Sequence, residues 1–222
     1  MDGRWVSVPP ERLAGWLDRF AERHGGIVES TVDPDVVVVT GADGAVADCR
    51  VPFPPLVPDG GPYGGLVAHA LADRRVGVLL GRLGGPAAGV FVGERLVASK
   101  VGSRQVHGRS AAGGQSQQRF ARRREGQVRV ALAAAADVAA AVLTPAAPTL
   151  DAVVLGGDRR AVDPVLADPR LAPLRPLVVE ARIDVPDPRL KVLQGTPELF
   201  RAVRIRVTDP EPTAGMLPRR GG

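Results

Sequence analysis

The sequence predicts an α/β (α+β) fold, and three observations support this class. Short apolar stretches at residues 75–83, 87–92 and 95–101 are separated by glycine-containing turns, a pattern typical of an antiparallel meander. The stretch from about Ser116 to Leu143 predicts one long helix that ends at Thr144-Pro145. A strand, a helix and a second strand follow between residues 151 and 180, and this order predicts a right-handed crossover.

The first 60 residues predict a small N-terminal element made of one helix and one β-hairpin. Pro9-Pro10-Glu11 starts the helix, and its apolar face recurs at helical spacing through Leu13, Trp16, Leu17 and Phe20. Strands at 35–40 and 45–51 flank a turn at 41–44 and form the hairpin. Residues 52–65 are rich in proline and glycine, so we expect a linker there.

Residues 66–208 predict a second domain, which opens with a short helix at 66–73 and continues with the meander. The first half of the long helix is rich in arginine and is expected to project into solvent. Its second half is expected to pack on a sheet through Leu132, Ala135, Val138, Ala139 and Val142. Beyond it we expect a strand at 151–155, a helix at 159–167 and a strand within 173–180. Residues 209–222 are rich in proline, glycine and arginine and are expected to form a flexible tail.

Positive charge is concentrated in one segment of the chain. The 222 residues carry 29 basic and 24 acidic side chains, a net charge of +5. Between Arg95 and Arg129 there are nine basic residues and one acidic residue, Glu125, and the remainder of the chain has a net charge of −3. Nearly all of the basic residues are arginines, which suit bidentate contacts with phosphate. A phosphate-rich partner is therefore expected at this segment.

Other chemistries have little support in the sequence. Cys49 is the single cysteine, so no intramolecular disulfide can form, and it is expected to be a small core residue. His24, His69 and His107 are far apart and lack ligand spacing, so no metal site is expected. No cofactor-binding pattern is present either. The apolar stretch 130–143 is expected to be too short and too weakly apolar to span a bilayer. We therefore expect a cytoplasmic protein with neither a membrane nor DNA as partner.

The centre of the basic segment is Gly113-Gly114-Gln115. Two glycines allow backbone conformations that other residues resist, and they let RNA approach the backbone closely. A backbone N–H presented there can stabilise the oxyanion of an ester undergoing hydrolysis. The glutamine amide has both donors and an acceptor, so it can orient a water molecule without carrying a charge. The tripeptide on its own is a weak signal in so glycine-rich a chain.

The residues around the tripeptide make the signal more specific. His107-Gly108-Arg109 precedes it, Ser116 follows it, and Arg119-Phe120-Ala121-Arg122 lies just beyond. The segment closely resembles the GGQ central domain of the eukaryotic and archaeal class I peptide-chain release factors. It departs from their pattern by the insertion of Ser110, Ala111 and Ala112 before Gly113. The Asn-Ile-Lys-Ser motif of stop-codon decoding is absent. The chain as a whole is similar to the bacterial, actinobacterial-type branch of the Vms-like release factors.

The resemblance implies a ribonuclease-H-like release-factor domain and codon-independent release of nascent chains from stalled ribosomes or large subunits. It implies ester hydrolysis of peptidyl-tRNA in the peptidyl-transferase centre, with Gln115, Gly114 and Gly113 as the catalytic residues. The residues expected to contact RNA are His107, Arg109, Ser116, Arg119, Arg122, Arg123 and Arg124. The partners it implies are the large ribosomal subunit and peptidyl-tRNA, and no oligomeric state can be derived.

Two alternatives remain open from the residues alone. The protein could be a nuclease that cleaves tRNA near its 3′ end, with His107 and a nearby arginine acting on a phosphodiester. It could instead be a non-catalytic factor that only binds ribosomal RNA. The reaction products distinguish the first alternative, because a nuclease shortens the tRNA. The substitution Gln115→Ala distinguishes the second alternative from a hydrolase, because a factor that only binds RNA would keep its role in this variant.

Overall fold

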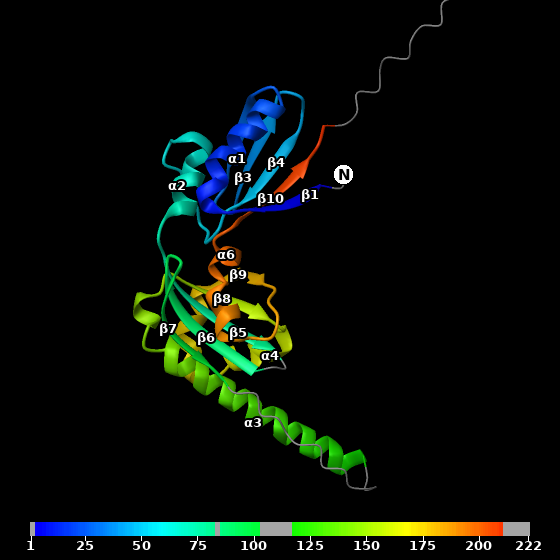
Figure 1. Cartoon of the computed structure of the whole chain (residues 1–222), viewed down its shortest axis with the longest axis vertical. Coiled ribbons are helices and arrows are strands. Elements are labelled where there is room, and N and C mark those ends of the chain that lie inside the picture. The colour runs from blue at the N-terminus through cyan, green and yellow to red at the C-terminus, as the bar shows by residue number, and fades with distance from the viewer. Residues whose placement is uncertain (1–2, 83–84, 103–116, 211–222) are drawn as a thin grey trace, which may run out of the picture. The chain divides into compact units, whose positions relative to one another are not determined.

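The computed structural model describes residues 3–82, 85–102 and 117–210 (Figure 1). The chain forms two compact units, one of residues 1–71 with 201–222 and the other of residues 72–200. Each unit contains one five-stranded sheet with helices. The mixed α/β class that the sequence predicts is therefore confirmed.

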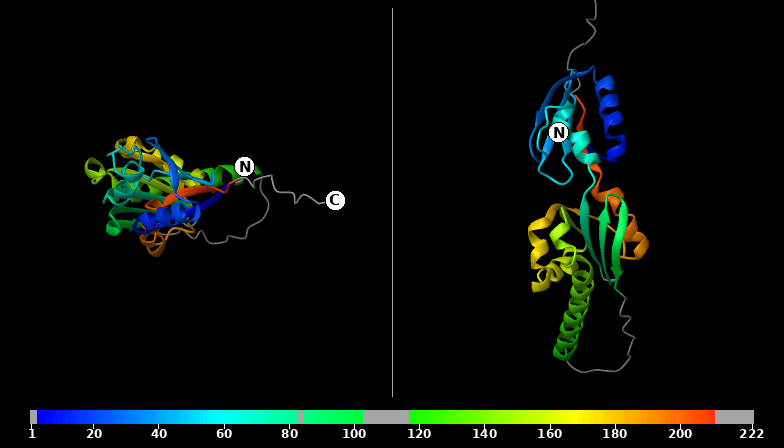
Figure 2. Two further views of the ribbon diagram at one scale, coloured as in Figure 1. Left: turned by 90° about the horizontal axis from the view of Figure 1, so that it is seen from above. Right: turned by 90° about the vertical axis from the view of Figure 1, so that its left-hand side faces the viewer.

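The first unit is an antiparallel sheet with two helices on one face. Its strand order is β1-β10-β4-β3-β2, and every neighbouring pair is antiparallel. The elements are β1 (Arg4–Val8), α1 (Pro10–Arg23), β2 (Ile27–Val32), β3 (Val36–Gly41), β4 (Val46–Arg50), η1 (Pro62–Gly65), α2 (Leu66–Leu71) and β10 (Val203–Thr208). The helices bury Leu13, Leu17 and Leu66 against the sheet, in one core with Val37 and Ile205. Figure 2 shows α1 lying against one face of these strands.

The first unit contains more strands than the sequence predicts. The helix and the β3–β4 hairpin are confirmed, but β1, β2 and β10 were not expected in it. Strand β10 was wrongly assigned to the domain ending at residue 208, because it lies between β1 and β4. Along this strand buried and exposed residues alternate: Val203, Ile205 and Val207 are buried, whereas Arg204 and Arg206 are exposed. The alternation shows a half-buried strand, but it does not reveal which sheet the strand joins.

The second unit has the strand order β7-β6-β5-β8-β9. Strands β5, β6 and β7 are antiparallel neighbours, while β8 is parallel to both β5 and β9. The elements are β5 (Arg75–Arg82), β6 (Gly85–Val92), β7 (Arg95–Val101), α3 (Gln117–Leu143), η2 (Ala147–Thr149), β8 (Ala152–Gly157), α4 (Arg159–Leu166), η3 (Pro169–Leu177), β9 (Val178–Ile183), α5 (Leu190–Gln194) and α6 (Pro197–Phe200). The predicted meander, long helix and parallel strand–helix–strand unit are confirmed. Strand β9 begins later than expected because the proline-rich residues 169–177 form η3.

Helix α3 packs on this sheet through its C-terminal half, as the sequence predicts. Ala135, Val138 and Ala139 are buried in the core, and Leu132 and Val142 are partly buried against it. Sheet residues of the same core include Ala88, Val90, Val153 and Leu155. This packing fixes one end of α3 and thereby sets the direction in which its other end leaves the sheet (Figure 1).

Residues 130–143 were expected to be too short and too weakly apolar to span a membrane, but the longer segment that contains them is not. By length and composition alone, Gly126–Leu143 could cross a membrane, with a mean hydropathy of 1.5. A core helix passes the same test, and α3 buries Ala136, Ala139 and Leu143 within its unit. The helix is thus a weak sign of a membrane span.

Candidate functional site

The structure frames the Gly113-Gly114-Gln115 segment with two defined elements. Strand β7 ends at Val101 and helix α3 begins at Gln117. The predicted residues His107, Arg109, Gly113, Gly114, Gln115 and Ser116 lie between these two elements, outside the described residues. The predicted arginines Arg119, Arg122, Arg123 and Arg124 belong to the first turns of α3. All ten candidate residues therefore lie on one excursion of the chain, residues 102–124, which runs from the end of β7 into the first turns of α3.

The excursion leaves the sheet at a defined edge. Strand β7 is antiparallel to β6, and β6 is antiparallel to β5, so β7 runs in the same direction as β5 and β8. Val101 therefore lies at the edge where the parallel strands have their carboxyl ends. This is the edge at which open α/β sheets commonly bind ligands.

The part of α3 at residues 127–131 is not packed against its unit. Gln127 to Ala131 are all exposed, including Val128 at 53% and Val130 at 52%, whereas Leu132 and the apolar residues that follow pack against the core. At 1.5 Å per residue, the part of the helix from Gln117 to Ala131 is about 22 Å long. Figure 1 shows α3 extending beyond the sheet. The helix can thus hold the residues near Gln117 well away from the folded core.

The packed end of α3 is braced by a polar cluster. Nη1 of Arg170 donates to Oδ1 of Asp137 on α3 at 2.7 Å, and Nη2 and Nε of Arg170 donate to Asp168 at 2.9 Å. The hydroxyl of Thr144, just after α3, donates to the carbonyl oxygen of Arg170 at 3.2 Å. The side-chain hydrogen bonds from Arg170, with one from its backbone N–H, lower the pKa of Asp168 to about 2. Sequence reasoning missed this cluster, since the end of α3 and the start of η3 meet only in the folded unit.

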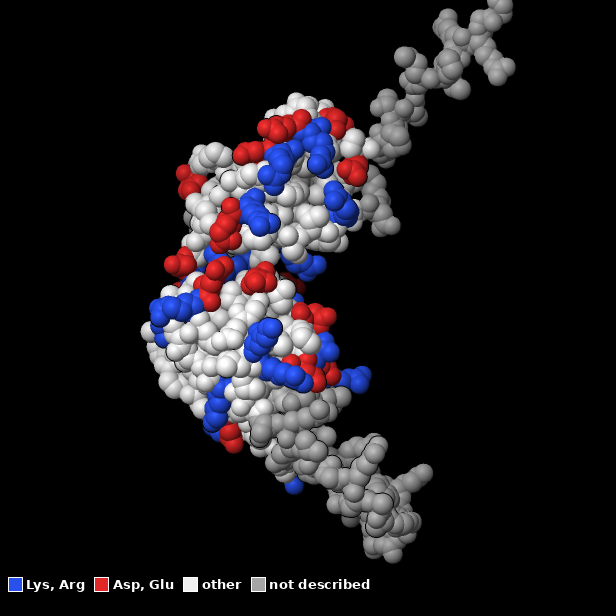
Figure 3. Space-filling model, in the orientation of Figure 1, with Lys and Arg blue, Asp and Glu red and all other residues white. Residues whose placement is uncertain are grey.

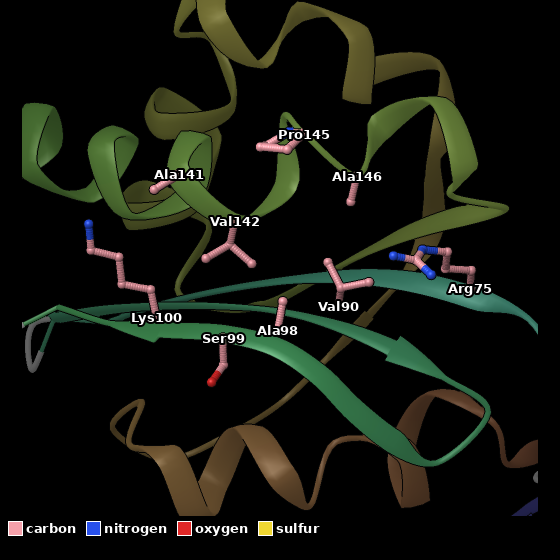
Figure 4. A pocket seen from close by; sticks show the side chains of 9 residues that line it. All are labelled: Arg75, Val90, Ala98, Ser99, Lys100, Ala141, Val142, Pro145 and Ala146. Carbon is pink, nitrogen blue, oxygen red and sulfur yellow. The ribbon is translucent and has the colours of Figure 1, made fainter.

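A groove runs along the packed end of α3 (Figure 4). It has a volume of about 470 Å³ and is lined by Arg75, Val90, Ala98, Ser99, Lys100, Ala141, Val142, Pro145 and Ala146. Figure 4 shows Lys100 and Arg75 at its two ends and Ser99 directed away from it. Its lining has no carboxylate, imidazole or thiol, so the groove offers no acid/base pair for hydrolysis.

Metal and thiol chemistry have no site in the described ranges. No group of three or more His, Cys, Asp or Glu side chains that could hold a metal ion occurs there. Cys49 is buried in the core of the first unit, as expected, and burial raises the pKa of its thiol to about 12. Because the thiolate is the reactive form, Cys49 is unsuited to be a nucleophile.

Charge over the described surface is mixed. On the face shown in Figure 3, lysine and arginine side chains are interspersed with aspartate and glutamate. Several of the arginines are paired, as in Arg82–Asp184 and Arg201–Glu11, both at 2.7 Å. Six of the nine basic residues between Arg95 and Arg129 lie on the excursion, which has no acidic residue.

Comparison with known proteins agrees with the motif. A family model described as the Actinobacteria/chloroflexi VLRF1 release factor, acVLRF1, matches residues 74–206, which is more than half of the chain. The chain belongs to the acVLRF1 release factor family. The matched range includes the meander, the whole excursion, α3, and the β8-α4-β9 unit. The resemblance found in the sequence is thus confirmed at the level of the family.

Among solved structures, the chain is similar to the archaeal translation termination factor aRF1. The identity is 13% and the TM-score 0.37, with 85% of this chain and 61% of that chain covered. This chain thus spans less than two thirds of the length of the archaeal factor. No curated protein matches the sequence.

Proposed function

We propose that this member of the acVLRF1 family is a codon-independent peptidyl-tRNA hydrolase of the cytoplasm. It would release nascent chains from stalled ribosomes or free large subunits. The observation that carries the proposal is the position of Gly113-Gly114-Gln115, at the centre of the one excursion with concentrated positive charge. Membership of a release factor family supports the same reaction.

The reaction is hydrolysis of the ester that joins the peptide to the terminal ribose of tRNA. A water oxygen attacks the carbonyl carbon, and the bond to the ribose oxygen breaks, so that the ribose hydroxyl leaves with a proton. The backbone N–H of Gln115 would stabilise the oxyanion of the tetrahedral intermediate. Its side-chain amide would orient the attacking water. Gly113 and Gly114 would give the backbone the shape that this close approach requires.

The described residues explain how such a segment can reach a buried ribosomal site. The packed half of α3 is fixed to the sheet and to η3, whereas residues 127–131 are exposed and the helix continues from there back to Gln117. Arg119, Arg122, Arg123 and Arg124 lie on this part of the helix, where they can neutralise phosphates of ribosomal RNA. The protein would thus supply positioning and one catalytic amide, and the surrounding RNA would supply the remaining groups.

The sheet of the second unit supports the proposed ribonuclease-H-like arrangement. In chain order within this unit, its strands run 3-2-1-4-5, with three antiparallel strands followed by two parallel ones. The excursion that carries the motif then connects the third strand to the long helix.

Separation of the reaction products tests the proposal. Large ribosomal subunits carrying labelled peptidyl-tRNA in the P site would be incubated with the protein, and the products separated on a denaturing gel. Hydrolysis yields free peptide and full-length tRNA. A shortened tRNA would indicate a nuclease, and bound protein without any product would indicate a binding factor; either result would reject the proposal.

A further inference from the structure

The sheet of the first unit has one face that its helices leave open. Helices α1 and α2 pack on the face that holds Val37, Cys49 and Ile205. The strand registers place Trp5, Arg206 and Asp48 side by side in one row of the opposite face. Ser7, Arg204 and Arg50 form the next row. In the described part of this unit, no helix packs against these two rows.

Two arginines lie directly opposite each other on this face. Arg204 of β10 pairs with Arg50 of β4 in the antiparallel register, and both residues are exposed. Like charges in this position oppose sheet formation. Within the described ranges, neither guanidinium has a carboxylate within 4.0 Å, whereas the neighbouring Arg206 is held by Asp48 at 2.6 Å. An anion bound between Arg204 and Arg50 would remove the repulsion, so this pair is suited to a phosphate group.

An aromatic ring lies beside the arginine pair. Trp5 of β1 is 46% exposed, and the guanidinium carbon of Arg204 lies 4.9 Å from its ring centroid. Indole and guanidinium planes are the surfaces on which unpaired bases stack. Partly buried Val36 and Val38 continue the two rows on β3. The face therefore combines two exposed arginines with an exposed aromatic ring in the neighbouring row of the sheet.

We propose that this face binds single-stranded RNA, with a phosphate between Arg204 and Arg50 and a base stacked against Trp5. Single-stranded RNA fits better than duplex, because only unpaired bases can reach the ring. It also fits better than an acidic peptide, whose carboxylates have no planar group to stack. The proposal is independent of hydrolysis by the Gly-Gly-Gln segment, and it gives the first unit a role in holding the protein on ribosomal or transfer RNA.

Tryptophan fluorescence can report on this face without interference from the basic excursion. The chain has two tryptophans, and the second, Trp16, lies on α1 stacked on Phe20 with centroids 5.6 Å apart. In the full chain with Trp16→Phe, all tryptophan emission comes from Trp5. Titration with a 12-nucleotide oligouridylate should quench this emission to saturation, and Gln115→Ala should leave the titration unchanged.

Matched charge variants identify the phosphate contacts. Arg50→Gln/Arg204→Gln should reduce the slope of log K against log salt by about 0.7, because neutralisation of one phosphate of a single strand contributes about 0.7. Relative to 1 M salt, this equals about 5-fold weaker binding at 0.1 M. Arg12→Gln/Arg19→Gln removes the same charge from exposed positions of α1 and should leave the slope near that of the parent. The conservative pair Arg50→Lys/Arg204→Lys should keep most of the parent slope.

Three results would overturn the proposal. The first is a Trp5 emission that oligouridylate does not quench. The second is an equal loss of slope in the α1 control pair, which would show that net charge alone governs binding. The third is equal quenching by polyglutamate, which would assign the face to an acidic protein segment. Unchanged near-ultraviolet circular dichroism would establish that each variant is folded.

Discussion

Arg170 of η3 donates from Nη1 to Oδ1 of Asp137 on α3 at 2.7 Å, across 33 residues of sequence. The pair lies where α3 is packed on its unit, so it restrains the helix that carries the proposed RNA-binding arginines. We predict that Arg170→Ala accelerates amide hydrogen exchange in residues 137–144 and leaves strands β5 and β6 unchanged. Arg159→Ala, at an exposed position of α4, should change neither region. Equal exchange in wild type and Arg170→Ala would show that the pair does not hold the helix.

The same cluster predicts a dependence of stability on pH. Hydrogen bonds from Arg170 lower the pKa of Asp168 from 3.8 to about 2. Because the pKa is lower in the folded state, the contribution of Asp168 is fully present above the unfolded value and is lost as the pH falls through the folded value. The difference in Tm between wild type and Asp168→Asn should therefore be constant above about pH 5 and shrink toward pH 2. A difference that grows with acidification would contradict the assignment.

Two glycines of the second unit should respond in opposite ways to alanine. Gly157 has a φ of +88°, and a Cβ there would lie 2.3 Å from the carbonyl oxygen of Gly81. Gly157→Ala should lower the free energy of unfolding by at least about 2 kcal/mol, because strain and overlap add. A Cβ at Gly126, inside α3, meets no atom within 4 Å. Gly126→Ala should raise the stability of the helix by about 0.5–1 kcal/mol. Chemical denaturation measures both changes.

The thiol of Cys49 should not react in the folded protein. It is fully buried, and burial raises its pKa to about 12, so the thiolate is scarcely populated at neutral pH. Labelling with an aromatic disulfide reagent should be negligible in buffer and stoichiometric in denaturant. Rapid labelling in buffer would show that the first unit opens on the time scale of the reaction.

Local sequence patterns predicted most of the second unit. Strands β5 to β7, helix α3 and the β8-α4-β9 unit were all expected, since each is marked by its own apolar periodicity or turn residues. The Gly113-Gly114-Gln115 segment was found through its resemblance to the release-factor motif, which its neighbours His107, Arg109 and Arg119 share. These features depend on residues close together in the chain.

Features formed by distant segments were not predictable in this way. Val203, Ile205 and Val207 alternate with arginines and so mark a strand, but only the fold shows that β10 lies between β1 and β4. The pairing of Arg204 with Arg50 follows from that placement, across more than 150 residues. The brace between Arg170 and Asp137 likewise depends on how η3 packs against α3.

The most direct test of the proposed reaction is peptide release by single-residue variants. Wild type, Gln115→Ala and the neighbouring control Gln118→Ala would be compared on large subunits that carry labelled peptidyl-tRNA, at equal ribosome occupancy. Misplacement of the attacking water should slow release by Gln115→Ala about 100-fold, while Gln118→Ala remains close to wild type and all tRNA stays full-length. Release by Gln115→Ala at the wild-type rate would contradict the placement of Gln115 at the reaction centre.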